Sequence, residues 1–207
     1  MAIEEYEVTP LFAEPFFRTH IGDAISDDQV EFIKNLDMVQ NKSNLISEDL
    51  YIFEKPELAS LKNAVQEVLD FYASEIMGWT QELYVTQSWS LANNPNIGMH
   101  GHSHSNSLIS GSLYFCELPT PVANMIFDRH NTYQLLQLSP EREKQNIYNT
   151  PVNVVTPKTG ELLLFNSGLQ HLVETNTTSK PRYSIAFNTF IKGKLGEFRD
   201  VSELTLS

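Results

Sequence analysis

Cysteine is nearly absent from this chain of 207 residues: Cys116 is the only one, so no disulfide can form within the chain. Because Cys116 stands among apolar residues, we expect a buried thiol with no chemical role. No run of apolar residues approaches the roughly 20 that a membrane-spanning helix needs. The first residues, MAIEEYEV, are acidic, whereas a secretory signal begins with basic residues and continues with apolar ones. These absences predict a cytoplasmic protein that does not associate with membranes.

Basic residues are also scarce. The chain has 14 Lys and Arg against 26 Asp and Glu, which gives a formal net charge of -12 at pH 7. Such a charge repels the phosphate backbone of nucleic acids unless a local basic patch overrides it, and the pair Lys192 and Lys194 is too small for that. Nucleic acid is therefore a poor candidate for the partner.

Two helices are predicted in the first 80 residues. Ser26 begins the first helix, because Gln29 follows at the capping-box spacing and apolar residues recur at helical spacing up to residue 36. Pro56 and Gly78 enclose the second helix, in which apolar residues stand three to four positions apart. Both helices are expected to pack on the outside of a β core.

After residue 78 the spacing of apolar residues becomes alternating, which predicts a half-buried strand at residues 83–91. Residues 6–17 contain two prolines and are typical of an edge strand or an extended arm. Short segments rich in β-forming residues predict further strands at residues 109–116, 123–127, 134–138, 152–155, 161–165, 169–174 and 182–191. We therefore expect a mainly β (α+β) fold, a cupin-like jelly roll or double-stranded β-helix. It would form one domain over residues 1–207, with the arm and helices at about 1–80 and the jelly-roll core at about 81–195.

The most informative segment is GMHGHSHSNSLISGSLYF, which begins at residue 98 and holds three of the six histidines within five residues. Side chains two apart in an extended strand point to the same side, so His102 can share a metal ion with either His104 or His100. Neutral imidazole is a common ligand for iron, zinc, copper and nickel. The alternative is a histidine-rich surface loop without a native metal.

A catalytic metal needs a third ligand, and His171 lies far enough downstream to come from a different strand. Three protein ligands on one side leave open positions on the metal, as in non-haem Fe(II) oxygenases. Arg182 follows eleven residues after His171, with Ser184 on the same side of the strand. The arginine fork matches a carboxylate, so this pair is a candidate clamp for a dicarboxylate close to the metal.

Three motifs, HSHSNSLISGSLYF, GELLLFNSGLQHLVE and RYSIAFN, stand in this order and together resemble the Fe(II)- and 2-oxoglutarate-dependent oxygenases. Within that family the chain is similar to small members found in phages and bacteria, so its compartment would be the host cytoplasm if a phage encodes it. The resemblance implies a jelly-roll enzyme that uses Fe(II), 2-oxoglutarate and O2. It implies that His102, His104 and His171 bind the iron and that Arg182 with Ser184 binds the far carboxylate of 2-oxoglutarate. The implied reaction hydroxylates a substrate and decarboxylates 2-oxoglutarate to succinate.

One departure from the family pattern concerns the metal ligands. The family places an acidic residue where this chain has His104, so the site would hold three neutral imidazoles and one more positive charge. Iron retention could weaken or another metal could be favoured. His100 in place of His104, or a carboxylate such as Asp128, are the alternatives for completing the set.

Several side chains are candidates for supporting roles. Tyr114 could offer its hydroxyl to the co-substrate or serve as a core residue, and Asn188, on the Arg182 side of its strand, could bind substrate or co-substrate or support a metal ligand. Asn106 and Ser107 could orient the histidines. Trp89 is expected to belong to the core.

Two other functional classes fit part of this pattern. A cupin-like three-histidine enzyme that does not use 2-oxoglutarate would explain the ligands but leaves Arg182 and Ser184 without a purpose. A non-catalytic jelly-roll module with a binding or structural role is the other. The substrate, a small molecule or a protein side chain, would be selected by loops at residues 120–124 and 139–151. The longer of these loops is expected to be solvated.

Overall fold

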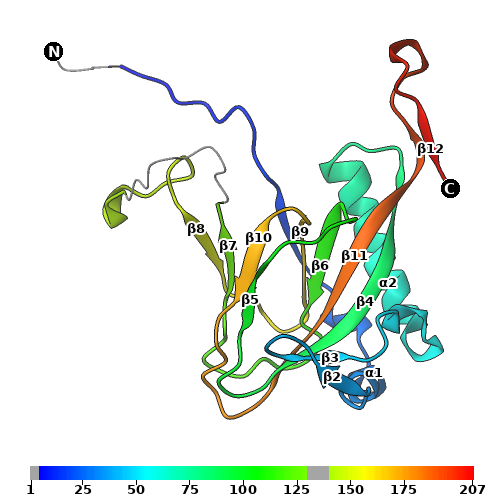
Figure 1. The fold of residues 1–207 in the computed structure, drawn as a ribbon, viewed down its shortest axis with the longest axis vertical. Helices are drawn as coiled ribbons and strands as arrows, with labels where there is room; N and C mark the ends of the chain where they lie inside the picture. The colour runs from blue at the N-terminus through cyan, green and yellow to red at the C-terminus, as the bar shows by residue number, and fades with distance from the viewer. Residues whose placement is uncertain (1–4, 130–139) are drawn as a thin grey trace.

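The computed structural model describes residues 5–129 and 140–207 and shows two antiparallel sheets that face each other (Figure 1). The large sheet runs in the order β1-β9-β6-β11-β4-β3-β2, with β12 paired to the far end of β11, and the small sheet runs β5-β10-β7-β8. The mainly β jelly-roll fold is thereby confirmed. The strands are β1 (Phe16–His20), β2 (Met38–Gln40), β3 (Leu45–Ser47), β4 (Glu82–Asn93), β5 (Met99–His102), β6 (Ile109–Leu113), β7 (Met125–Asp128), β8 (Val152–Val155), β9 (Glu161–Asn166), β10 (Gln170–Val173), β11 (Arg182–Leu195) and β12 (Leu204–Leu206).

Both predicted helices are present and cover the outer face of the large sheet (Figure 1). Helix α1 (Asp27–Lys34) begins with the expected capping box, in which Ser26 and Gln29 bond reciprocally. Helix α2 (Ala59–Phe71) continues into a π-helical turn at Tyr72–Ile76. Short 3-10 turns occur at Gly22–Ala24, Ile52–Glu54, Pro56–Leu58, Arg142–Lys144 and Phe198–Asp200. None of the helices in the described ranges is long and apolar enough to cross a membrane.

The large sheet separates two apolar clusters. Along β9, Leu162 and Leu164 pack with the helices, whereas Leu163 and Phe165 pack between the two sheets. This alternation follows from the strand period of two residues and explains why the four central residues of β9, Leu162 to Phe165, are all apolar. Cys116 is buried at the helix side, as expected, and burial raises the pKa of its thiol.

The face of the large sheet that looks toward the small sheet is polar along its two central strands. Strand β6 presents Ser110 and Ser112 there, and β11 presents Arg182 and Ser184, all of which are buried. Gly111 lies between the two serines on the opposite face, where a Cβ would stand 2.0 Å from the Phe187 ring. Polar residues buried inside a β sandwich need partners, so this face is where a functional site is expected.

The predicted strands at 83–91, 109–116, 123–127, 152–155, 161–165, 169–174 and 182–191 are confirmed with small shifts at their ends, and the one at 134–138 lies outside the described residues. Of residues 6–17, predicted as an edge strand or an extended arm, only Phe16 and Phe17 belong to β1, and residues 5–15 are neither helix nor strand. The β2–β3 hairpin was not predicted. It extends the large sheet beyond β4, where Ile46 pairs with Leu91, and it brings residues 41–44 to the rim of the site described next.

Candidate metal centre and co-substrate pocket

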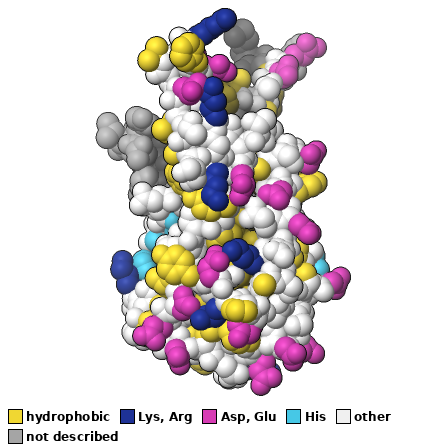
Figure 2. Space-filling view, turned by 90° about the vertical axis from the view of Figure 1, so that its right-hand side faces the viewer, with side chains coloured by type: hydrophobic (Ala, Val, Ile, Leu, Met, Phe, Trp, Pro, Cys, Tyr) yellow, Lys and Arg dark blue, Asp and Glu magenta, His cyan; other side chains and the backbone are white. Residues whose placement is uncertain are grey.

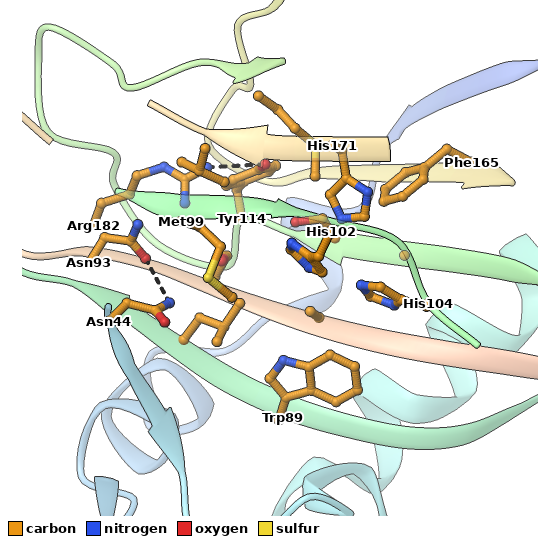
Figure 3. A pocket seen from close by; sticks show the side chains of 17 residues that line it. Asn44, Trp89, Asn93, Met99, His102, His104, Tyr114, Phe165, His171 and Arg182 are labelled. Carbon is orange, nitrogen blue, oxygen red and sulfur yellow. Dashed lines mark hydrogen bonds between the residues drawn. The ribbon is translucent and has the colours of Figure 1, made fainter. Parts of the chain in front are cut away.

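Three histidines converge between the two sheets (Figure 3). His102 ends β5 and lies directly opposite His171 of β10, and His104 follows two residues beyond the end of β5. One ring nitrogen from each lies within 4.8 Å of the others. Cross-strand pairing therefore explains how residues almost 70 positions apart meet at one point.

Hydrogen bonds fix the same tautomer on all three rings. The Nδ1 of His102 lies 2.9 Å from the His100 carbonyl, and the Nδ1 of His171 lies 2.9 Å from the Leu169 carbonyl. The Nδ1 of His104 lies 2.5 Å from Oδ1 of Asn188. Carbonyl and amide oxygens only accept, so each Nδ1 carries the hydrogen and each neutral ring keeps its Nε2 lone pair for a metal.

His104 receives the most elaborate support. The Ser110 hydroxyl lies 3.0 Å from His104 Nδ1, donates to Asn188 Oδ1 at 3.0 Å, and lies 2.8 Å from the hydroxyl of Ser167. The Ser107 hydroxyl continues the chain at 2.7 Å from that of Ser167. This network orients the ring of His104 and agrees with a supporting role for Ser107.

The environment of His104 and His171 favours the neutral form of these two rings. Burial lowers the pKa of His104 and lowers that of His171 to about 3. In both cases burial is the largest cause, and the neighbouring His102 adds to it. Neutral imidazole is the form that binds metals, so these two rings are available as ligands at neutral pH.

Both alternative ligands lie outside this group. His100 lines a second cavity, which is described below as the outer cavity. The Nδ1 of His100 is buried and has no hydrogen-bond partner in the described part of the chain. Asp128 pairs with Gln170, is exposed, and lines a groove that the three histidines do not reach. Because Phe127 pairs with His171 and is buried, the next residue, Asp128, points to the other side of the small sheet.

The three histidines line a cavity, called the inner cavity below, together with a second group of polar side chains that includes Arg182 (Figure 3). Arg182 is only 2% exposed. Its Nη2 donates to the Tyr114 hydroxyl at 3.2 Å, and its guanidinium carbon lies 5.0 Å from the centre of that ring. Its Nε, however, has no hydrogen-bond partner among the described residues, nor does any carboxylate of these residues form an ion pair with Arg182. A buried charge without a counter-ion is costly, so this end of the cavity favours an anionic ligand.

Asn93 adds a second unpaired donor. It lies directly across from Arg182 on β4, and its Oδ1 accepts from Nδ2 of Asn44 at 3.1 Å. Its own Nδ2 is buried and lacks a partner within the described ranges. Ser184 also lines this cavity, so donors from three positions surround the space beside Arg182.

An outer cavity of about 290 Å³ lies on the other side of the histidines. Trp89, Met99, His102 and His104 line both cavities. The prediction that Trp89 belongs to the core was therefore wrong: the ring is half-buried, lies 6.0 Å from that of His104 between centres, and belongs to neither apolar cluster. The Trp89 side chain lies on the face of the large sheet that looks toward the small sheet, where it borders the two cavities instead of packing in an apolar core.

The comparisons with known proteins agree with this geometry. Residues 87–188 match a family model described as "Putative 2OG-Fe(II) oxygenase", and this segment contains the three histidines, Arg182 and Ser184. This segment of the chain belongs to the 2OG-Fe(II) oxygenase family. The members of this family are enzymes, and the expected subgroup of phage and bacterial proteins stays a prediction. A search of curated proteins found no match.

Several solved structures share the fold. HygX from Streptomyces hygroscopicus, solved with nickel and 2-oxoglutarate, is 14% identical with a TM-score of 0.60, and the match covers 85% of this chain and 82% of that one. A Pseudomonas putida prolyl-4-hydroxylase is 13% identical with a TM-score of 0.58, over 87% and 94% of the two chains. An oxidoreductase of the same family from Burkholderia pseudomallei is 11% identical with a TM-score of 0.59, over 84% and 83%. At these identities the similarity shows the jelly-roll fold.

The structure thus brings together most of the predicted site residues. Tyr114 is both a buried core residue and the hydrogen-bond partner of Arg182. Asn188 supports His104 and lines the outer cavity rather than the one that contains Arg182. Asn106 adopts a left-handed turn conformation with a φ of 55°. Asn44 and Asn93 were missed, because the register that places Asn93 opposite Arg182 cannot be read from either segment alone.

Proposed function

We propose that this protein is an Fe(II)- and 2-oxoglutarate-dependent dioxygenase that hydroxylates an organic substrate. His102, His104 and His171 would hold the iron through Nε2. Arg182, with Ser184 and Tyr114, would bind the far carboxylate of 2-oxoglutarate. The observation that carries this proposal is the buried Arg182, whose Nε lacks a partner among the described residues and which shares one cavity with the three histidines.

The residues fit both groups. Three neutral imidazoles are suitable ligands for Fe(II) and leave coordination positions for a chelating keto acid and for oxygen. With His104 in place of an acidic ligand, the site has one more positive charge, which adds to its attraction for a dianionic co-substrate. Asn93 offers a further N–H beside Arg182, so the carboxylate of 2-oxoglutarate would satisfy two donors that have no partner among the described residues.

The chain's own residues contribute orientation and exclusion of water. Asn188 and Ser110 hold the ring of His104, and Tyr114 holds the guanidinium of Arg182. Phe165 packs edge-on against His171 at 4.9 Å between ring centres. When bound together, Fe(II) and 2-oxoglutarate supply the oxidising chemistry, in which 2-oxoglutarate, O2 and substrate yield succinate, carbon dioxide and hydroxylated substrate.

Related structures support this proposal and widen the range of outcomes. HygX has been solved with nickel, 2-oxoglutarate and hygromycin B, and SnoN with Fe3+, alpha ketoglutarate and nogalamycin RO. SnoN is an alpha ketoglutarate dependent epimerase and SnoK an alpha ketoglutarate dependent carbocyclase, so proteins of this fold also catalyse reactions other than hydroxylation. The three-histidine set itself favours the second candidate, a metalloenzyme that does not use 2-oxoglutarate, but this candidate leaves the Arg182 cavity without a ligand.

Succinate release distinguishes these candidates. Protein loaded anaerobically with Fe(II) should consume O2 and release succinate when 2-oxoglutarate is added, slowly without substrate. Arg182→Ala should abolish this release, whereas Arg199→Ala, an exposed arginine near the C-terminus, should not change it. Iron binding without any 2-oxoglutarate-dependent O2 consumption or succinate would contradict the proposal and favour the three-histidine enzyme.

A further inference from the structure

We propose that the outer cavity binds a small organic anion as substrate and that Lys42 recognises its carboxylate or similar acidic group. This inference rests on the proposed function, because the outer cavity opens onto His102 and His104 and would hold the molecule to be oxidised. Lys42 is the only charged side chain among the described residues that line this cavity, apart from the histidines.

The backbone that carries Lys42 is firmly held. Lys42 lies in the turn between β2 and β3, which is closed by a bond from the Asn41 amide to the Asn44 carbonyl at 2.9 Å. The Ser43 hydroxyl donates to the Gly98 carbonyl at 2.9 Å, which ties the turn to the segment just before the histidine strand β5. On the inner side Asn44 bonds to Asn93. The position of the Lys42 backbone is therefore fixed relative to the histidines, and only its side chain has to adjust to a ligand.

The charges around the outer cavity differ from those of the whole molecule. The chain carries a formal net charge of -12. Figure 2 shows acidic side chains spread over the surface. At the left edge of that view, a basic side chain lies beside histidine side chains that reach the surface. None of the described residues that line the outer cavity is acidic. Lys42 is exposed and forms no ion pair within the described part of the chain. A positive charge at the entrance of the outer cavity attracts anions locally, although the protein as a whole is negatively charged, and it repels cationic substrates.

The remaining lining defines the rest of the ligand. Trp89, Ile46 and Met99 provide an apolar wall, while Asn41, Ser105 and Asn188 provide neutral hydrogen-bonding groups. The volume of about 290 Å³ lies at the lower end of the range for small-molecule sites. The site therefore fits a compact molecule with one apolar or aromatic part and one acidic group.

Phenylacetate and its neutral counterpart phenylacetamide test this chemistry. Binding of each to the full-length, metal-free protein is measured by ligand-observed NMR titration at low salt. In the wild type, phenylacetate should bind about fivefold more tightly, the gain expected from one partly exposed ion pair. Lys42→Gln should remove this preference and Lys42→Arg should keep it. Arg182→Met should also keep it, because the preference arises at the outer cavity.

Three results would overturn the inference: equal affinity of the two probes for the wild type, binding of neither, or a preference that survives Lys42→Gln and disappears in Arg182→Met. The last result would mean that the carboxylate enters the inner cavity. None of these titrations requires iron or 2-oxoglutarate, so failure of the proposed function, which appears in the succinate assay, can be told apart from failure of this inference.

Discussion

The two cavities that meet at the histidines each contain one basic side chain, and the two environments are opposites. In the inner cavity Arg182 is 2% exposed and has a donor without a partner in the described ranges. In the outer cavity Lys42 is exposed and sits on a surface turn. Charge interactions are strong where water is excluded and weak where water and salt screen them.

This difference indicates a division of labour. A buried guanidinium discriminates sharply, because any ligand that leaves it unpaired incurs the full cost of an uncompensated charge. An exposed ammonium group discriminates only mildly and tolerates ligands of different shape. The inner cavity is thus suited to a single co-substrate. The outer cavity is suited to a substrate whose selection rests on small differences in binding free energy.

The largest effect is expected at Arg182. Replacing it by Met should weaken 2-oxoglutarate binding by 100-fold or more, because a buried charge pair is lost. The same change should leave the thermal stability of the ligand-free protein unchanged or raise it, because it removes a buried charge that has no counter-ion among the described residues. Calorimetric titration and thermal unfolding of the same samples measure both. A large loss of stability without any change in 2-oxoglutarate affinity would show that Arg182 is a structural residue.

The next effect concerns the metal rather than either cavity. Asn188→Ala removes the oxygen that accepts from His104 Nδ1, so the ring loses its fixed tautomer and orientation. Metal affinity should fall about 10- to 100-fold, as is usual when such a partner is removed. Competition with a metal chelator measures this, and Asn94→Ala, at an exposed turn position, is the matched control. Equal affinity of Asn188→Ala and wild type would contradict the role of Asn188 in positioning His104 for the metal.

A smaller effect tests the sheet that separates the site from the helices. Gly111→Ala would place a Cβ 2.0 Å from the ring of Phe187, which is fully buried. We expect a loss of about 1–3 kcal/mol in the free energy of unfolding, because overpacking forces the ring or the strand to move. Urea denaturation measures it. The double variant with Phe187→Leu should recover part of the loss, and a simple sum of the two single losses would argue against this contact.

The smallest effect contrasts the two cavities directly. Raising NaCl from about 0.02 M to about 0.5 M should reduce the preference for phenylacetate over phenylacetamide severalfold, since screening acts on exposed charges. The affinity of metal-loaded protein for 2-oxoglutarate should change much less. Parallel titrations at the two salt concentrations give both values. Equal salt dependence would mean that the two cavities do not differ in exposure to solvent.

Much of this arrangement could be predicted from the sequence because strands leave a local pattern. Alternation at residues 83–91 predicted β4, and the β-forming residues at 182–191 predicted β11. The spacing of His102 and His104 suggested a shared metal even though His104 lies just beyond the end of β5. Arg182 was assigned from its order after His171 and from the family resemblance, and its burial beside Tyr114 agrees with that assignment.

The parts that could not be predicted depend on register or on very short elements. Strands β2 and β3 have three residues each, too few to show a period. The two asparagines and the serine around Lys42 are typical of a turn between these strands. Nothing in these residues indicates that the turn lies beside the histidines. Asn93 became a candidate only through its pairing with Arg182, and Trp89 was taken for a core residue because nothing local distinguishes a cavity wall from a core.

The most direct test of the central claim, that one ligand spans from the histidines to Arg182, is a comparison of 2-oxoglutarate with glutarate, which lacks only the keto oxygen. Calorimetry on metal-free and Fe(II)-loaded protein under anaerobic conditions should show that metal tightens binding of 2-oxoglutarate at least tenfold. The same metal should change binding of glutarate by much less, because glutarate cannot chelate through a keto group. If metal leaves both affinities unchanged, or changes them equally, the metal centre and the Arg182 cavity do not share a ligand and the account is wrong.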